Sequence, residues 1–131
     1  MSQSLSQLIT DLSTFPELDL ATLEKLFGLS FTKTANQNEY FDFFLDADNN
    51  IELRIDKNDV RRKILIFEIE PAENFSEDMI ISEYPTAEPN SHSPNDPTYK
   101  SLTLSKPWGK ISFGFNSDDV LTSLVFDSTK L

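Results

Sequence analysis

The stretch Ile51-Glu-Leu-Arg-Ile-Asp56 decides the fold of this chain, because apolar and charged side chains alternate strictly along it. A period of two is typical of a strand with one buried and one solvated face. The flanking segments Ala47–Asn50 and Lys57–Asp59 have the composition of turns. The neighbouring runs Tyr40–Asp46 and Lys63–Glu70 are rich in apolar residues. The sequence therefore predicts three antiparallel strands joined by short turns.

Two short helices are predicted ahead of these strands. Apolar residues at positions 5, 8, 9 and 12 have the spacing of one helix face, and Pro16 ends that pattern. A second helix fits Asp19–Phe27, with Asp19 as its N-cap and Gly28 just past its end. Each helix has one apolar side that needs to be covered.

Strand patterning returns in the C-terminal third. Leu102 and Leu104 alternate with polar residues, Lys106–Gly109 reads as a turn, and the runs 110–115 and 120–126 alternate or are apolar. The 131 residues suit a single domain, 1–131. We expect an α+β fold in which two N-terminal helices pack on one face of an antiparallel sheet of about five to six strands.

Charge and composition exclude several classes of function. There are 22 acidic and 11 basic residues, which gives a net charge of -11. This disfavours binding to nucleic acid, which needs clustered Lys and Arg, and docking on anionic membranes. The chain has no Cys, one His and three Gly, too few for a thiolate or multi-His metal site or a glycine-rich phosphate loop. The absence of Cys and of a secretory signal favours the cytoplasm.

No catalytic or metal-binding constellation stands out. The single His92 lies among turn-forming residues, where a catalytic base would lack rigid support. Asp46, Asp48 and Asn50 open like a calcium-binding EF-hand loop, but the later positions of that pattern are missing. We therefore predict no catalytic residue, no metal and no cofactor. A carboxylate-based hydrolase using two acids on an open sheet face is the enzyme alternative.

The segment from Pro71 to Tyr99 differs from the rest. It contains five of the seven Pro, six acidic residues and no Lys or Arg. Residues 75–84 fit either a helical turn or a short edge strand, and we expect an irregular loop from Thr86 to Thr98. One interpretation is a solvating linker. The other is an excursion that steers a basic partner toward the protein.

The aromatic residues of the first strands suggest a second contact surface. Phe41 and Phe43 are expected in the core, which would leave Tyr40 and Phe44 on the uncovered face of the sheet. Trp108, in a turn, fits either an exposed anchor or a lid on the core. Acidic side chains at polar strand positions could gather on the same face, namely Asp42, Glu52 and Asp56, with Arg54 and Lys57 as counterions. This group fits either an ordinary solvated sheet face or a binding surface.

Taken together, the layout resembles a small bacterial immunity protein of a polymorphic-toxin or contact-dependent inhibition system. The features that carry the resemblance are the helical start ending in Leu26-Phe27-Gly28, the meander Tyr40–Glu70, the acidic body and the closing hairpin Lys110–Phe126. The resemblance implies a protein that binds one toxin and blocks it without doing chemistry. Many such toxins are nucleases with basic clefts, which an acidic inhibitor would suit.

The chain is also similar to a type III secretion chaperone, which is an acidic α/β dimer that binds an effector segment along apolar grooves. Here the usual C-terminal helix is absent, since Val120–Phe126 reads as a strand. A chaperone or adaptor is therefore the alternative function.

The predicted partner is a protein, a basic toxin domain, bound by a monomer or weak dimer. Six acids and one ring are the predicted contact residues, chosen from the acidic segment and from the open sheet face. They are Glu73, Glu77, Asp78, Glu83, Tyr84, Asp42 and Glu52.

Overall fold

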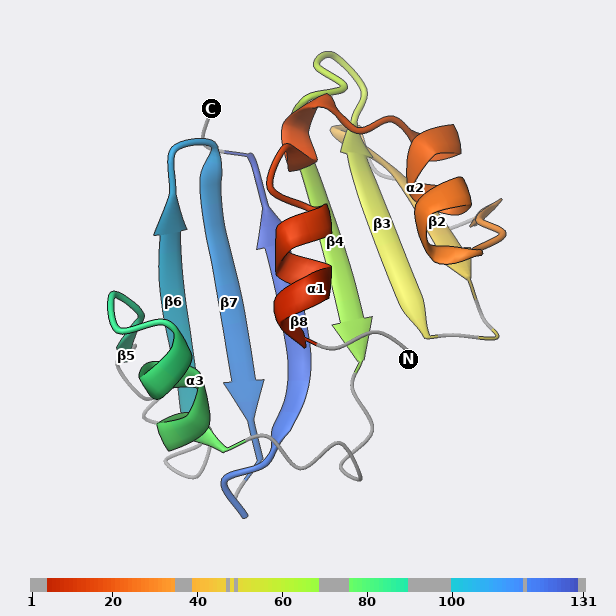
Figure 1. Ribbon diagram of the computed structural model, residues 1–131. Coiled ribbons are helices and arrows are strands. Elements are labelled where there is room, and N and C mark those ends of the chain that lie inside the picture. The colour runs from red at the N-terminus through yellow and green to blue at the C-terminus, as the bar shows by residue number, and fades with distance from the viewer. Residues whose placement is uncertain are drawn as a thin grey trace.

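The computed structural model describes residues 5–34, 39–46, 48, 50–68, 76–89, 100–116 and 118–129 (Figure 1). Short helices and strands follow one another along the chain. In order they are α1 (Leu5–Asp11), the 3-10 turn η1 (Phe15–Glu17), α2 (Leu20–Phe27), β1 (Thr32–Lys33), β2 (Phe41–Asp46), β3 (Ile51–Asp56), β4 (Lys63–Glu68), α3 (Glu77–Glu83), β5 (Glu88–Pro89), β6 (Lys100–Lys106), β7 (Gly109–Phe115) and β8 (Leu121–Asp127).

All eight strands form one sheet in the order β1-β2-β3-β4-β8-β7-β6-β5, and every neighbouring pair is antiparallel. Strands β1 to β4 make one meander and β5 to β8 make another. The two meanders meet where the last strand of each, β4 and β8, pair side by side at the centre of the sheet (Figure 1).

The predicted fold class was wrong, because the protein is dominated by its sheet. The described residues form eight strands where five to six were expected, and among them α3 is a third short helix from the middle of the chain. The additional strands β1 and β5 have two residues each, too few to show any periodicity in a sequence. Strand β5 also lies inside the stretch predicted to be an irregular loop.

Helix α2 begins and ends as its sequence predicts. The Asp19 carboxylate accepts a hydrogen bond from the backbone N–H of Thr22 at 2.8 Å, which satisfies one free donor of the first turn. Gly28 closes the helix in the left-handed conformation, with φ of 65°. Beyond it, the backbone N–H of Ser30 donates to the buried Asp46 carboxylate at 2.8 Å. This bond anchors the start of β1 to the end of β2.

The core lies between the helices and one face of the sheet. Figure 1 shows all three helices on the same side of the sheet, with α1 in front of its centre and α2 and α3 toward opposite edges. Leu12 of α1, Leu23 of α2 and Ile80 of α3 are buried in one apolar cluster with sheet residues such as Leu65 and Phe113. Burial of this kind is the main favourable contribution to folding.

An aromatic cluster joins the N-terminal segment to both meanders. The Phe15 ring lies 5.5 Å from Trp108 and 6.0 Å from Phe126, and Phe126 in turn meets Phe67 edge-on at 5.9 Å. The indole N–H of Trp108 donates to the carbonyl of Ser13 at 3.0 Å. Of the two interpretations of Trp108, the structure supports a lid on the core.

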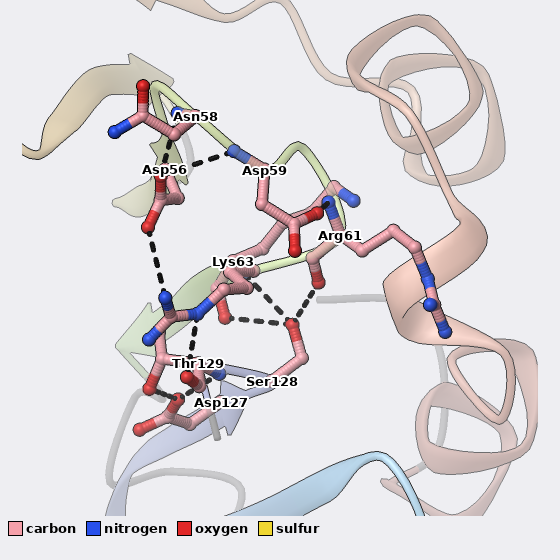
Figure 2. Close-up of polar contacts among 9 residues, drawn as sticks. Asp56, Asn58, Asp59, Arg61, Lys63, Asp127, Ser128 and Thr129 are labelled. Atoms are coloured by element: carbon pink, nitrogen blue, oxygen red, sulfur yellow. Dashed lines mark hydrogen bonds and ion pairs between the residues drawn. The ribbon is translucent and has the colours of Figure 1, made fainter. Parts of the chain in front are cut away.

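A polar junction closes the end of the sheet where β4 begins and β8 ends (Figure 2). The Ser128 hydroxyl accepts the backbone N–H of Lys63 at 2.9 Å and donates to the carbonyl of Arg61 at 2.6 Å. The guanidinium of Arg62 donates to the carbonyl of Thr129 at 2.8 Å. These bonds hold the β3–β4 loop and the end of β8 together.

The β3–β4 loop is further braced by Asp56 at its start. The Asp56 carboxylate accepts the backbone N–H of Asn58 at 2.7 Å and of Asp59 at 3.2 Å, which is the pattern of an Asx turn (Figure 2). Arg62 lies 3.6 Å from the other carboxylate oxygen. The loop presents Val60, which is 68% exposed, from a well-supported backbone.

Gly109 is the position where a side chain is least tolerated. Its φ is 151°, and a Cβ there would collide with the backbone carbonyl of Asp127. We expect Gly109→Ala to lower the free energy of unfolding by about 2–4 kcal/mol, because the obstructing atom belongs to the backbone. Gly28→Ala is the matched control: it meets open space and carries only the left-handed strain, roughly 1 kcal/mol. Urea titration of both variants compares them, and equal losses would contradict the steric explanation.

Lys63 provides a test by pH. Its side chain is buried, and its ammonium donates to the carbonyl of Pro16 at 2.9 Å. Burial lowers the pKa of Lys63 below its usual 10.5, and the nearby carboxylates of Glu17, Asp59 and Asp19 oppose that shift.

Between the lowered pKa and 10.5, the unfolded chain binds more protons at this position than the folded chain does. The free energy of unfolding contributed by Lys63 therefore rises with pH across that window. We expect the stability of the wild type to rise relative to that of Lys63→Met as the pH increases toward 10.5, measured by urea titration at several pH values. If the stability of the wild type minus that of Lys63→Met stays constant or falls as the pH rises, the burial of the charged amine is contradicted.

Candidate binding surfaces

The strand register assigns each side chain to one of the two faces of the sheet, because directly paired residues lie on the same face. Phe44 pairs with Leu53, Leu53 with Leu65, and Leu65 with Phe126. All of these pack in or against the core under the helices. This row therefore marks the face that the helices cover.

The opposite face carries a mixed apolar and charged surface. Two rows of directly paired residues cross β2, β3, β4, β8 and β7 on that face, and none of their apolar residues belongs to the core cluster. None of the three described helices lies over it (Figure 1). We call these two rows the open-face patch. The first row is Phe43, Arg54, Ile64, Asp127 and Lys110, and the second is Leu45, Glu52, Ile66, Val125 and Ser112.

The predicted orientation of β2 was wrong. Phe41 and Phe43 share the uncovered face, whereas Phe44 packs against the core. The reason is that β2 uses carboxylates at positions on the covered face: Asp46 is buried and holds the backbone of Ser30. Polarity along this strand therefore alternates opposite to burial. Phe44, the one apolar residue out of phase, was the available signal.

The same register divides the acids that were expected to gather on the uncovered face. Asp42 pairs with Ile55, which packs against the core, so it lies on the covered face, whereas Glu52 lies on the open face. Asp42 has ion pairs with Lys33 at 3.5 Å and Lys57 at 4.0 Å. The expected acidic cluster of Asp42, Glu52 and Asp56 does not form.

Arg54 and Glu52 are neighbours on the open face of β3, separated in the sequence by Leu53 on the covered face. The Arg54 guanidinium is 3.1 Å from the Glu52 carboxylate, and its carbon lies 4.8 Å from the centre of the Phe43 ring. Its Nε atom is buried and finds no hydrogen-bond acceptor among the described residues. A buried donor without an acceptor is costly. The patch thus contains an unsatisfied polar group among apolar side chains.

Two shallow grooves lie along the open face. One, of about 250 Å³, is lined by Leu45, Asn50, Glu52, Ile66 and Glu68 and borders the patch. The other, of about 340 Å³, lies at the β6–β7 turn. It is lined by Thr103, Ser105, Lys106, Pro107, Gly109, Lys110 and Asp127.

Helix α3 forms an acidic surface at the other end of the structure. Ser76 caps it by accepting a hydrogen bond from the backbone N–H of Met79 at 3.3 Å. Glu77 and Asp78 in its first turn interact favourably with the positive end of the helix dipole. Ile80 is buried beneath the helix, whereas Met79 is 51% exposed. The helix therefore presents its carboxylates and one apolar side chain to solvent.

The turn between β7 and β8 adds to this negative charge. The backbone N–H of Glu77 donates to the Asp119 carboxylate at 3.4 Å, which brings the turn beside the start of α3. Residues 76–89 include no Lys or Arg. We call five acidic residues of α3 and this turn the α3 acidic surface: Glu77, Asp78, Glu83, Asp118 and Asp119. In the described chain, no basic group lies within 4.0 Å of any of their carboxylates.

Tyr84 follows α3 directly and is held in place by the core. Its ring stacks on Phe113 with centroids 6.1 Å apart, and its backbone N–H donates to the carbonyl of Ile80 at 2.8 Å. Burial raises the pKa of the Tyr84 hydroxyl, and the nearby charge of Glu83 adds to the effect. Tyr84 is thus half-buried beside the acidic surface.

The predicted contact residues do not form one site. Glu77, Asp78, Glu83 and Tyr84 lie together on or next to α3. Asp42 and Glu52 lie elsewhere, on opposite faces of the sheet, and each has a basic partner. Glu73 lies outside the described residues.

Comparison of the chain with protein-family models, curated proteins and solved structures found no match. Among the described residues, no three side chains of His, Cys, Asp or Glu gather as a metal site would require. In the same part of the chain, no helix has the length and apolar character needed to cross a membrane.

The orientation of β2 can be tested with two neighbouring phenylalanines. We expect Phe44→Ala to lower the free energy of unfolding by about 2 kcal/mol or more, because its ring packs against the core. Phe43→Ala is the matched control on the other face and is expected to cost clearly less. Chemical denaturation of the two variants measures the difference. A larger loss for Phe43 would show that the faces are assigned incorrectly.

Proposed function

We propose that this protein is a binding module that neutralises a basic protein partner, a toxin domain, by docking it on the α3 acidic surface. The observation that carries the proposal is the concentration of charge there. Three carboxylates of α3 and two of the β7–β8 turn have no ion-pair partner in the described structure, and the Asp119 carboxylate of the turn contacts the start of α3.

Uncompensated charge of one sign acts over a longer distance than charge that is already paired. A protein surface rich in Lys and Arg is drawn toward such a region, which raises the rate of association. Met79, exposed between the carboxylates, supplies apolar contact area once the partner has arrived. Tyr84 is held against Phe113 and needs little additional ordering on binding.

The geometry narrows the predicted contact residues to one end of the molecule. Asp42 and Glu52 are already neutralised by Lys33, Lys57 and Arg54, so their charges attract a basic partner less. Glu77, Asp78 and Glu83 remain as the main charged contacts of the proposal. A cysteine-free chain fits a reducing compartment, so we place its action in the cytoplasm. That it acts without catalysis stays a prediction.

The proposal predicts the effect of charge reversal on α3. The double substitution Glu77→Lys with Asp78→Lys should slow association with the toxin domain by about tenfold or more. Added salt should likewise lower the association rate of the wild type, because it screens the attraction. The partner to test is sought among the proteins encoded by the genes adjacent to this one, where the proposal expects a basic toxin domain. Stopped-flow association kinetics and rescue of cell growth on co-expression are the two measurements.

The control is a double charge reversal of the same size near the opposite edge of the sheet, Glu39→Lys with Asp48→Lys. These two exposed residues lie just before and just after β2. The control should keep most of the association rate, because its charges are far from α3. Equal slowing in both variants would reduce the effect to net charge alone. Unchanged rates in the α3 variant, or failure of the wild type to bind the toxin domain, would overturn the proposal.

A further inference from the structure

The open-face patch differs from the rest of the surface in its charge. The whole chain has a net charge of -11, yet the patch contains two basic residues, Arg54 and Lys110, and two acidic ones, Glu52 and Asp127. Its charge is therefore balanced. A basic partner gains no electrostatic advantage by docking there, so the patch is a poor match for the partner proposed above.

Apolar side chains fill most of the remaining positions of the patch. Phe43 and Leu45 on β2, Ile64 and Ile66 on β4, and Val125 on β8 lie on the same uncovered face. The solvated face of an antiparallel sheet normally carries polar residues at such positions. A contiguous apolar group on that face is typical of a protein contact surface.

We propose that two copies of this chain bind each other face to face through their open-face patches. A two-fold axis that crosses the strands midway between the two rows leaves each strand opposite itself and exchanges the rows. On β2, β3 and β4 the rows are then complementary: Phe43 faces Leu45, Ile64 faces Ile66, and Arg54 faces Glu52 of the second copy. On β8 and β7, at the margin of this match, Asp127 faces Val125 and Lys110 faces Ser112. An interface of this kind is closed at two copies.

The exchange of Arg54 and Glu52 is the electrostatic reason for choosing a second copy as the occupant. Arg54 of each copy faces Glu52 of the other copy, so the interface contains two such pairs and no other kind of partner is needed to supply the opposite charge. The packing of twisted sheets, at about 30° to each other, keeps this match closest at the centre of the interface. Strand β4, which carries Ile64 and Ile66, is the middle strand of the patch, and β3, which carries Arg54 and Glu52, lies directly beside it.

The first experiment measures mass in solution. Sedimentation equilibrium of the wild type should show a reversible monomer–dimer equilibrium. Ile66→Lys should raise the dissociation constant by about tenfold or more, because it places an ammonium against the apolar Ile64 of the second copy. Val60→Lys is the matched control, since Val60 is 68% exposed on the β3–β4 loop, outside the patch. Circular dichroism confirms that both variants fold. A wild type that stays monomeric at all accessible concentrations overturns the proposal.

The second experiment tests the exchange itself by charge complementation. Glu52→Arg and Arg54→Glu should each weaken self-association, because each variant places like charges opposite one another. An equimolar mixture of the two variants should form a heterodimer. At these two positions the first variant carries only cations and the second only carboxylates, so every facing pair is then of opposite charge. If the Arg54–Glu52 pair only stabilises the fold of its own chain, the mixture is not expected to form a heterodimer. Absence of the heterodimer overturns the arrangement.

The two proposals can fail independently, because the patch and the α3 acidic surface share no residue. The Ile66→Lys variant should still bind the basic partner, and the Glu77→Lys, Asp78→Lys variant should still form dimers. A monomeric wild type that binds an extended apolar peptide on the patch would favour the chaperone alternative and overturn the second copy as occupant.

Discussion

The pairing of β4 with β8 is the interaction on which the structure depends. Ile64 pairs with Asp127 and Glu68 with Ser123, so more than 50 residues separate the partners, whereas the other pairs join strands that follow one another in the chain. Each meander can form locally, but only this pairing unites them into one sheet and one core. Leu65 and Phe126, opposite each other in it, are both fully buried. The long-range step is the expected slow event in folding.

In the two proposals made above, the two sides of the molecule serve two kinds of recognition. The helices cover one face of the sheet, and α3 carries negative charge beyond its edge, where long-range attraction of a cationic surface works best. The uncovered face has balanced charge and apolar side chains, which act only on contact. Keeping these surfaces apart allows one to act without occupying the other. The buried anchor of α3, Ile80, fixes the acidic surface to the same core that supports the sheet.

Local signals in the sequence were sufficient for much of the fold. The strict alternation of Ile51–Asp56 correctly predicted β3, and Asp19 and Gly28 correctly marked the ends of α2, because each reflects chemistry within a few residues. The phase of β2 failed because Asp46 is buried to hold the backbone of Ser30, a contact between distant residues. The two-residue strands and the β4–β8 pairing also depend on tertiary structure. Composition alone singled out the α3 residues as candidates, which stay a prediction; the uncovered sheet face was also anticipated, but with the wrong aromatic residues on it, because the phase of β2 was misassigned.

The edges of the sheet limit how far this protein can assemble. The outermost strands are β1 and β5, with two residues each, and Lys33 and Pro89 stand in them. A proline offers no backbone donor, and so short an edge gives an incoming strand almost no ladder to extend. Short outer strands that carry a lysine or a proline are among the features that limit edge-to-edge strand addition in natural sheets.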